Sequence, residues 1–181
     1  MGTHNLRNTG TVRNIVRRCK HPHYQEVRTG SDIMLLKLNE SVPVGRRIQR
    51  IGLPLANMNV KDNQMCHVAG WGWTEDSNHV SVDDLRVVHV SVVNQNVCRW
   101  QWSNSKWIPH LPANVICAGG YRTLNGACHG DSGGPLVCNG MAAGVVNFGD
   151  PDCRDQRFPN IYTDVSKFRP WIDTILRQNG C

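Results

Sequence analysis

The chain has 181 residues and a net charge of +6, with 40% hydrophobic and 19% charged residues. This is the composition of a globular domain and excludes an intrinsically disordered chain. No apolar run reaches the ~18 residues that a membrane-spanning helix needs, so we expect no membrane span. The first residues contain no basic segment followed by an apolar stretch, so we expect no signal peptide in this chain.

Basic residues gather in two short segments, residues 13–20 and residues 46–50. The simpler interpretation is two solvated, charged surfaces. The alternative is attraction to polyanions such as glycosaminoglycans. No nucleic-acid-binding motif accompanies the charge, so nucleic acid is not an expected partner.

Short β-rich runs separated by turn signals recur along the chain, which is typical of a sandwich or a barrel. The predicted strands are residues 11–17, 32–38, 65–69, 85–93, 134–137, 142–147 and 160–163. Residues 32–38 are almost continuously apolar, which predicts a strand buried on both faces. Only the C-terminal end looks helical, because its apolar residues from Val165 to Leu176 follow a 3.6-residue period.

Eight cysteines are many for a chain of this length. No two form a Cys-x-x-Cys pair, so a zinc ribbon or a thioredoxin-like site is not expected, and we predict neither a metal nor a cofactor. An even number of dispersed cysteines is typical of a disulfide framework in an oxidising compartment. The cysteines therefore indicate a protein of the secreted type.

The most informative motif is Gly-Asp-Ser-Gly-Gly-Pro at residues 130–135. Glycines beside Ser132 let the backbone turn tightly and approach a substrate carbonyl. The N–H groups of Gly130 and Ser132 can then point at a developing oxyanion. A lone Gly-x-Ser-x-Gly is weak, but this hexapeptide between Cys128 and Cys138 is much more specific. It predicts a serine nucleophile for acyl transfer.

Together with this motif, several further segments resemble the chymotrypsin-like serine protease family, and they follow one another in the order that the family has. They are residues 31–38, 66–72, 116–119, 159–163 and 171–172. The resemblance covers the chain from Gly2 to its end. It implies an all-β fold of two antiparallel β-barrels, the first incomplete, with a C-terminal α-helix. Residues 1–56 would be the remainder of the N-terminal barrel, residues 57–164 the C-terminal barrel and residues 165–181 the helix.

The resemblance implies a serine endopeptidase in which Ser132 is the nucleophile, Asp32 is the triad aspartate, and Gly130 and Ser132 form the oxyanion hole. None of the eight histidines stands in the Ala-Ala-His-Cys context that the family uses, and His4 matches a segment just after it. We therefore expect the catalytic histidine to be absent, together with roughly fifty residues of a complete domain. Without a base the serine hydroxyl is a weak nucleophile, so the chain alone is expected to be inactive.

In the family, a freed N-terminal ammonium pairs with the aspartate before the nucleophile, which is Asp131 here. The resemblance also implies a substrate pocket, formed by Gly126, Ala127, His129, Asn147, Phe148, Gly149 and Asn160. Gly126 stands where trypsin-like enzymes carry an aspartate, so a preference for arginine or lysine is not expected. Gly149 leaves the entrance of this pocket open, and Asn160, in place of a small residue at the back of the pocket, makes the pocket shorter. His129 is either a polar contact or an exposed rim residue. An elastase- or chymotrypsin-like pocket for aliphatic or medium apolar residues is expected.

The resemblance implies three disulfides: Cys66–Cys138, Cys98–Cys117 and Cys128–Cys153. Cys19 and Cys181 remain, either bonded to each other or free. The implied partners are protein and peptide substrates, protein inhibitors and glycosaminoglycans, in a secreted or secretory-granule protein. The alternative is a non-catalytic protease homologue that binds polyanions or protein partners.

Overall fold

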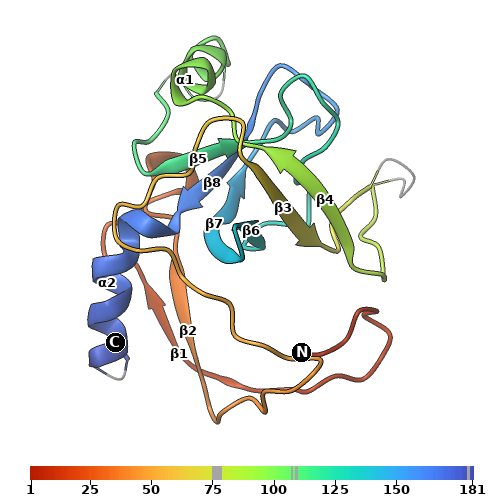
Figure 1. Cartoon of the computed structure of the whole chain (residues 1–181), viewed down its shortest axis with the longest axis vertical. Helices are drawn as coiled ribbons and strands as arrows, with labels where there is room; N and C mark the ends of the chain where they lie inside the picture. The colour runs from red at the N-terminus through yellow and green to blue at the C-terminus, as the bar shows by residue number, and fades with distance from the viewer. Residues whose placement is uncertain (75–78, 107, 109, 179) are drawn as a thin grey trace.

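The computed structural model describes residues 1–74, 79–106, 108, 110–178 and 180–181, and it is mostly β (Figure 1). The strands are β1 (Ile15–Lys20), β2 (Met34–Leu38), β3 (Met65–Gly70), β4 (Arg86–Ser91), β5 (Val115–Ala118), β6 (Pro135–Cys138), β7 (Met141–Phe148) and β8 (Asn160–Asp164). The helices are η1 (Val27–Thr29, a single 3-10 turn), α1 (Gln95–Ser103) and α2 (Val165–Arg177). The predicted all-β class with a C-terminal helix is confirmed.

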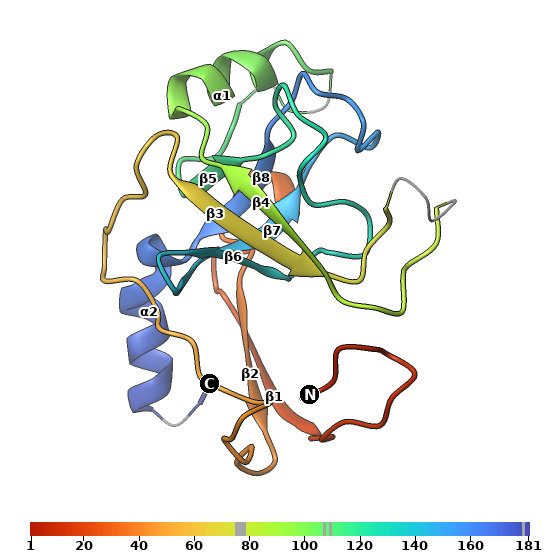
Figure 2. The same ribbon diagram turned by 45° about the vertical axis from the view of Figure 1, so that its right-hand side comes forward.

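Two antiparallel sheets organise the described chain. Strands β1 and β2 pair as a two-stranded sheet, and the other six form a curled sheet in the order β4-β3-β6-β7-β8-β5 (Figure 2). Buried side chains such as Val90, Leu136 and Tyr162 pack inside the curl of the larger sheet. The motif at residues 130–135 leads directly into β6, so the fold of the larger sheet positions it.

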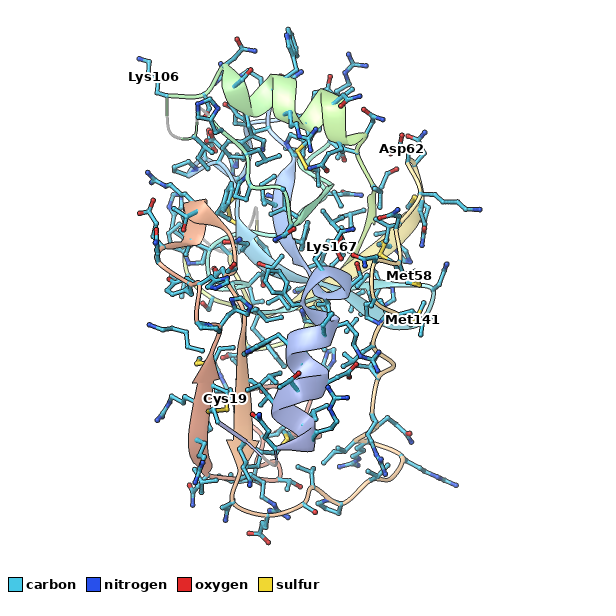
Figure 3. All side chains as sticks on the ribbon, turned by 90° about the vertical axis from the view of Figure 1, so that its left-hand side faces the viewer. Cys19, Met58, Asp62, Lys106, Met141 and Lys167 are labelled. Carbon is cyan, nitrogen blue, oxygen red and sulfur yellow. A yellow bond between two sulfur atoms is a disulfide. The ribbon has the colours of Figure 1, made fainter. Side chains whose placement is uncertain are left out.

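Helix α2 joins the two sheets. Its Phe168 and Ile172 are buried against Ile33, which immediately precedes β2. Figure 3 shows α2 lying alongside the β1–β2 sheet, with Cys19 beside the helix. Cys19 is disulfide-bonded to Cys181, so this pair adopts the bonded alternative. The other disulfides are Cys66–Cys138, Cys98–Cys117 and Cys128–Cys153, the pairs that the family resemblance implies.

Strand β2 is not buried on both faces, so that prediction is wrong. Met34 and Leu36 are 47% and 48% exposed, because α2 covers only the opposite face of the two-stranded sheet. The first strand is also displaced from the predicted residues 11–17, since β1 begins at Ile15 and ends at Lys20. The other predicted strands lie within two residues of the observed ones at each end.

The expectation that only the C-terminal end is helical is wrong as well. Helix α1 begins after Asn94, whose side-chain oxygen accepts hydrogen bonds from the N–H groups of Asn96 and Val97. Such a cap satisfies backbone donors that a helix end leaves unpaired. Only Cys98 and Trp102 of α1 are buried, so its apolar pattern is too short to show a helical period. Neither α1 nor α2 combines the length and the apolar character that a membrane crossing requires, as judged from the described residues.

Candidate active site

Ser132 is exposed on two consecutive tight turns. The Asp131 N–H donates to Cys128 O at 3.0 Å, and the Gly134 N–H donates to Asp131 O at 2.8 Å. Gly130 and Gly133 have φ values of 97° and 81°, which side chains other than hydrogen rarely tolerate. The glycines of the motif are therefore required by this backbone.

Strand β7 holds the nucleophile turn in place. The Gly133 N–H donates to Val146 O at 2.9 Å, and the Val146 N–H donates to Gly134 O at 2.8 Å. Within the described chain the N–H groups of Gly130 and Ser132 have no acceptor. Unpaired backbone donors are the groups that stabilise an oxyanion, so both N–H groups are available for the role predicted for them.

Asp32 is linked by a residue of β8 to the part of β7 that holds the nucleophile turn. Its carbonyl oxygen accepts a hydrogen bond from Thr163 Oγ1 at 2.9 Å. Thr163 is paired with Val145 of β7, next to the residue that binds the nucleophile turn. Burial raises the pKa of the Asp32 carboxyl above its usual value. No hydrogen bond to the Asp32 carboxylate is found among the described residues, so no donor stabilises its charge.

All eight histidines are described, and none is joined to Asp32 or Ser132 by a hydrogen bond or ion pair in the described chain. His21 packs between Phe168 and Trp171, with ring centroids 5.1 and 4.9 Å away. His67 and His89 face each other across β3 and β4. The described neighbours of these three rings are therefore other aromatic side chains, and not Ser132 or Asp32.

The Asp131 carboxylate points away from the serine and into the backbone of residues 70–72. It accepts hydrogen bonds from the N–H groups of Gly72 at 2.8 Å and Cys128 at 3.0 Å. A Cβ atom added at Gly70 would lie 2.0 Å from a carboxylate oxygen, so any side chain here would displace the Asp131 carboxylate. The amino group of Met1 donates to Thr11 O at 2.7 Å, and so it is not the partner of Asp131.

A cleft of about 860 Å³ lies beside Asp131. Val68 and Val88 are among its apolar lining residues, and Trp73 and His129 lie on its wall. The rings of Trp73 and His129 are 4.5 Å apart, and His129 Nε2 is 2.9 Å from Pro151 O. His129 is exposed, as a rim residue is expected to be.

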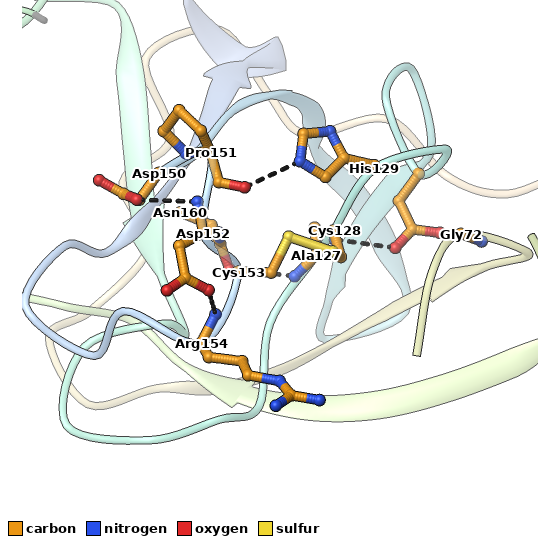
Figure 4. The surroundings of a disulfide bond; sticks show 11 residues. Gly72, Ala127, Cys128, His129, Asp150, Pro151, Asp152, Cys153, Arg154 and Asn160 are labelled. Atoms are coloured by element: carbon orange, nitrogen blue, oxygen red, sulfur yellow. Dashed lines mark hydrogen bonds between the residues drawn. A yellow bond between two sulfur atoms is a disulfide. The ribbon is translucent and has the colours of Figure 1, made fainter. Parts of the chain in front are cut away.

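The predicted pocket residues come from three segments: residues 126–129, residues 147–149 at the end of β7, and Asn160 at the start of β8. The Cys128–Cys153 disulfide ties residues 126–128 to the loop that follows β7 (Figure 4). Asn160 is 7% exposed, and its Oδ1 accepts a hydrogen bond from the Ala127 N–H at 3.0 Å. Phe148 contacts Trp102 edge-on at 5.4 Å between centroids. The structure thus brings Gly126, Ala127 and Asn160 together, with Gly126 leaving no charge at this wall.

Asn147 lies one strand residue before Phe148 and is buried. Its Nδ2 donates to Thr163 Oγ1 at 3.3 Å, while its Oδ1 is buried without a hydrogen-bond partner in the described chain. Since Thr163 also donates to Asp32, Asn147 is joined to the aspartate through a shared threonine. Sequence reasoning missed Thr163, because a threonine inside a strand gives no signal of its own.

Comparison with known proteins places the chain in a family. The family model described as Trypsin matches residues 1–172. The chain belongs to the trypsin family. This confirms the resemblance to chymotrypsin-like serine proteases that the motif at residues 130–135 indicates.

Bovine duodenase-1 is 35% identical to this member of the trypsin family over 98% of the chain and 68% of the relative's length. Mouse granzyme B(G,H) is 34% identical over 99% of the chain and 70% of its own length. Among solved structures, neuropsin, a serine protease expressed in the limbic system of mouse brain, is similar with a TM-score of 0.85 and 28% identity. That match covers 97% of this chain and 77% of the neuropsin chain.

Proposed function

We propose that this trypsin-family chain is a serine endopeptidase domain in which Ser132 attacks the peptide carbonyl. The observation that carries the proposal is the exposed serine on a double turn, with the N–H groups of Gly130 and Ser132 free to bind the oxyanion. Asp32 would orient the base, because Thr163 holds it beside the strand that also holds the nucleophile turn. Residues 1–56, 57–164 and 165–181 would act together as one peptidase domain.

We further propose that this chain alone hydrolyses peptides very slowly. A serine hydroxyl needs a base to take its proton, and no histidine in the described chain is hydrogen-bonded or ion-paired to Ser132 or Asp32. In a related mechanism, loss of the histidine lowers turnover by roughly 10⁶-fold. A free imidazole molecule in solution would supply the missing base to an otherwise formed site.

Labelling with a fluorophosphonate probe tests both statements. We expect no labelling of the 181-residue chain in buffer, and slow labelling in the presence of imidazole that Ser132→Ala abolishes. Labelling in buffer alone would contradict the proposed inactivity. Labelling that persists in Ser132→Ala, or no labelling with imidazole, would contradict the assignment of Ser132 as a competent nucleophile.

The pocket supports cleavage after uncharged residues rather than after arginine or lysine. Gly126 contributes no carboxylate to its wall, and Ala127 and Gly149 are apolar and small. We therefore propose an elastase- or chymotrypsin-like preference for aliphatic or medium apolar residues. Peptide aldehydes that differ only in this residue test it without turnover, and tighter binding of the lysine aldehyde than of the valine aldehyde would refute it.

A second function, binding of glycosaminoglycans, is favoured by the exposed face of β1. Arg18 and Lys20 project from the same face of the strand and are both exposed. Each basic residue that contacts a polyanion adds to the salt dependence of binding. We expect the double variant Arg18→Ala, Lys20→Ala to elute from a heparin column at lower salt than Arg46→Ala, Arg47→Ala. Equal elution of the two would refute a site on β1. Such partners, like protein inhibitors, fit a secreted or granule protein.

A further inference from the structure

Two histidines lie directly opposite each other on neighbouring strands of the larger sheet. His67 of β3 and His89 of β4 are partners in the antiparallel register, and their ring centroids are 6.1 Å apart. Opposed residues of such a pair point to the same side of the sheet, with Cβ atoms about 4.5–5.5 Å apart. The backbone of β3 and β4, which lie side by side in Figures 1 and 2, therefore holds both imidazoles together.

Burial of the neighbouring residues shows that the two histidines face outward. Cys66 and Val68, on either side of His67, are 1% and 3% exposed, and Val90, next to His89, is 1% exposed. Successive side chains of a strand point to opposite faces, so the core lies behind the two rings. His89 is exposed and His67 is partly exposed, so solvent reaches both imidazoles.

The ring nitrogens of this pair are available to a ligand. Within the described chain, neither imidazole is hydrogen-bonded or ion-paired to another residue. The residues that share this face of β3 and β4 are all uncharged, and they are Met65, Ala69, Val87 and Ser91. A cation between the two rings would therefore meet no positive side chain from either strand.

A second pair of histidines lacks this property. The rings of His21 and His23 are 5.4 Å apart, but the His23 N–H donates to His21 Nδ1 at 3.3 Å. The His21 ring also packs against Phe168 and Trp171. One nitrogen of His21 is occupied and its ring is enclosed, so this pair does not present two free nitrogens to solvent.

We propose that His67 and His89 together bind Zn²⁺ on the outer face of the sheet. Imidazole is a preferred zinc ligand, and two nitrogens that are each about 2.0–2.1 Å from one ion are at most about 4 Å apart. Rings with centroids 6.1 Å apart reach that separation by turning toward each other. The described residues contain no group of three or more histidine, cysteine or carboxylate ligands, so water completes the coordination.

This site is separate from the residues of the proposed function. Val68 and Val88, which line the cleft beside Asp131, point to the other side of the same strands. The sequence predicts no metal because its cysteines lack a zinc-binding spacing, whereas His67 and His89 meet only in the folded sheet. Zinc binding can therefore be tested without any hydrolysis, and its outcome is independent of Ser132.

Zinc titration of the oxidised 181-residue chain at pH 7.5, followed by the histidine ring signals in ¹H–¹⁵N spectra, tests the proposal. We expect the signals of His67 and His89 to change together, at lower zinc than the signal of exposed His110. His67→Ala should weaken zinc binding at His89 by about tenfold or more, since even the loss of a partner behind a metal ligand costs about 10–100-fold in affinity. The matched control, His23→Ala, should leave both signals unchanged.

Each outcome decides the proposal. Unweakened binding at His89 in His67→Ala would show that the rings bind zinc singly and would overturn the shared site. Responses of His67 and His89 that need as much zinc as His110 would also overturn it, and this comparison uses the unchanged chain alone.

Thermal unfolding gives a second readout, because a ligand that binds only the folded sheet raises the melting temperature. Excess Zn²⁺ should raise it in the unchanged chain and in His23→Ala more than in His67→Ala or His89→Ala. Mg²⁺, which prefers oxygen ligands, should not raise it. An equal rise with zinc in all four proteins would refute the site.

Discussion

Replacing Trp102 with alanine is expected to lower the free energy of unfolding by about 3–5 kcal/mol, the range for deleting a large buried aromatic ring. Trp102 is 1% exposed, and its ring lies 5.0 Å from that of Phe158 and 5.4 Å from that of Phe148. Its indole N–H donates to Pro159 O at 3.1 Å. The substitution therefore leaves a cavity beside Phe148 and Phe158 and an unpaired carbonyl at Pro159.

Trp100 provides a matched control on the same helix, because it is 64% exposed. Trp100→Ala should change stability by no more than about 0.5 kcal/mol. Trp102→Phe keeps a ring but removes the N–H donor, and that hydrogen bond should account for about 1 kcal/mol of the loss.

Urea unfolding of the oxidised protein, followed by far-UV circular dichroism at pH 7, separates these variants. With a slope of about 2 kcal/mol per molar urea, the midpoint of Trp102→Ala should fall by roughly 2 M. A midpoint for Trp102→Ala as high as that for Trp100→Ala would refute the view that α1 is anchored through Trp102. Equal losses in Trp102→Phe and Trp102→Ala would show that the hydrogen bond, and not the packing, is what stabilises the helix.

Three further changes are expected to be measurable. Replacing Cys19 and Cys181 with serine opens a loop of 162 residues and should cost about 3–5 kcal/mol, seen as a lower urea midpoint. Burial, and to a lesser degree the neighbouring His23, lowers the pKa of His21. The stability that the neutral His21 side chain contributes is therefore present above pH 6.5 and is lost as the pH falls. His21→Phe should make the melting temperature depend less on pH between pH 7.5 and 5. Leu36→Lys places a charge on the exposed face of the β1–β2 sheet, and it should raise the protein concentration at which light scattering begins, because bare apolar sheet surface promotes association. For each of these three changes, an unchanged measurement would contradict the physical reason given for it.

Much of the fold follows from patterns that are local in the sequence. The run at residues 65–69 and the run at residues 142–147 correspond to β3 and β7 because alternating and apolar residues report directly on a half-buried strand. The same rule fails for β2. Its apolar run reads as buried on both faces, but burial depends on what covers each face, and α2 reaches only one of them.

The candidate site likewise has parts that can be predicted from local sequence and parts that cannot. Ser132 and its glycines can be predicted because the turn that they form is encoded within six residues, and the positive φ angles demand that composition. The hydrogen bond from Thr163 to Asp32 cannot be predicted, because it joins residues 131 positions apart and a threonine on β8 has no distinguishing sequence pattern. The side-chain orientation of Asn160 is equally hidden, since it is set by the Ala127 N–H on a separate loop.

Strand β7 explains why the parts of this site can be tested separately. Val146 binds the nucleophile turn through two backbone hydrogen bonds, and Val145 is paired with the threonine that holds Asp32. The next residues, Asn147 to Gly149, continue directly into the proposed pocket wall. Because one strand positions the nucleophile, the aspartate and the pocket, none of these three depends on the general base for its placement. Supplying a base in solution should therefore reveal the reactivity of Ser132 without rebuilding the rest of the site.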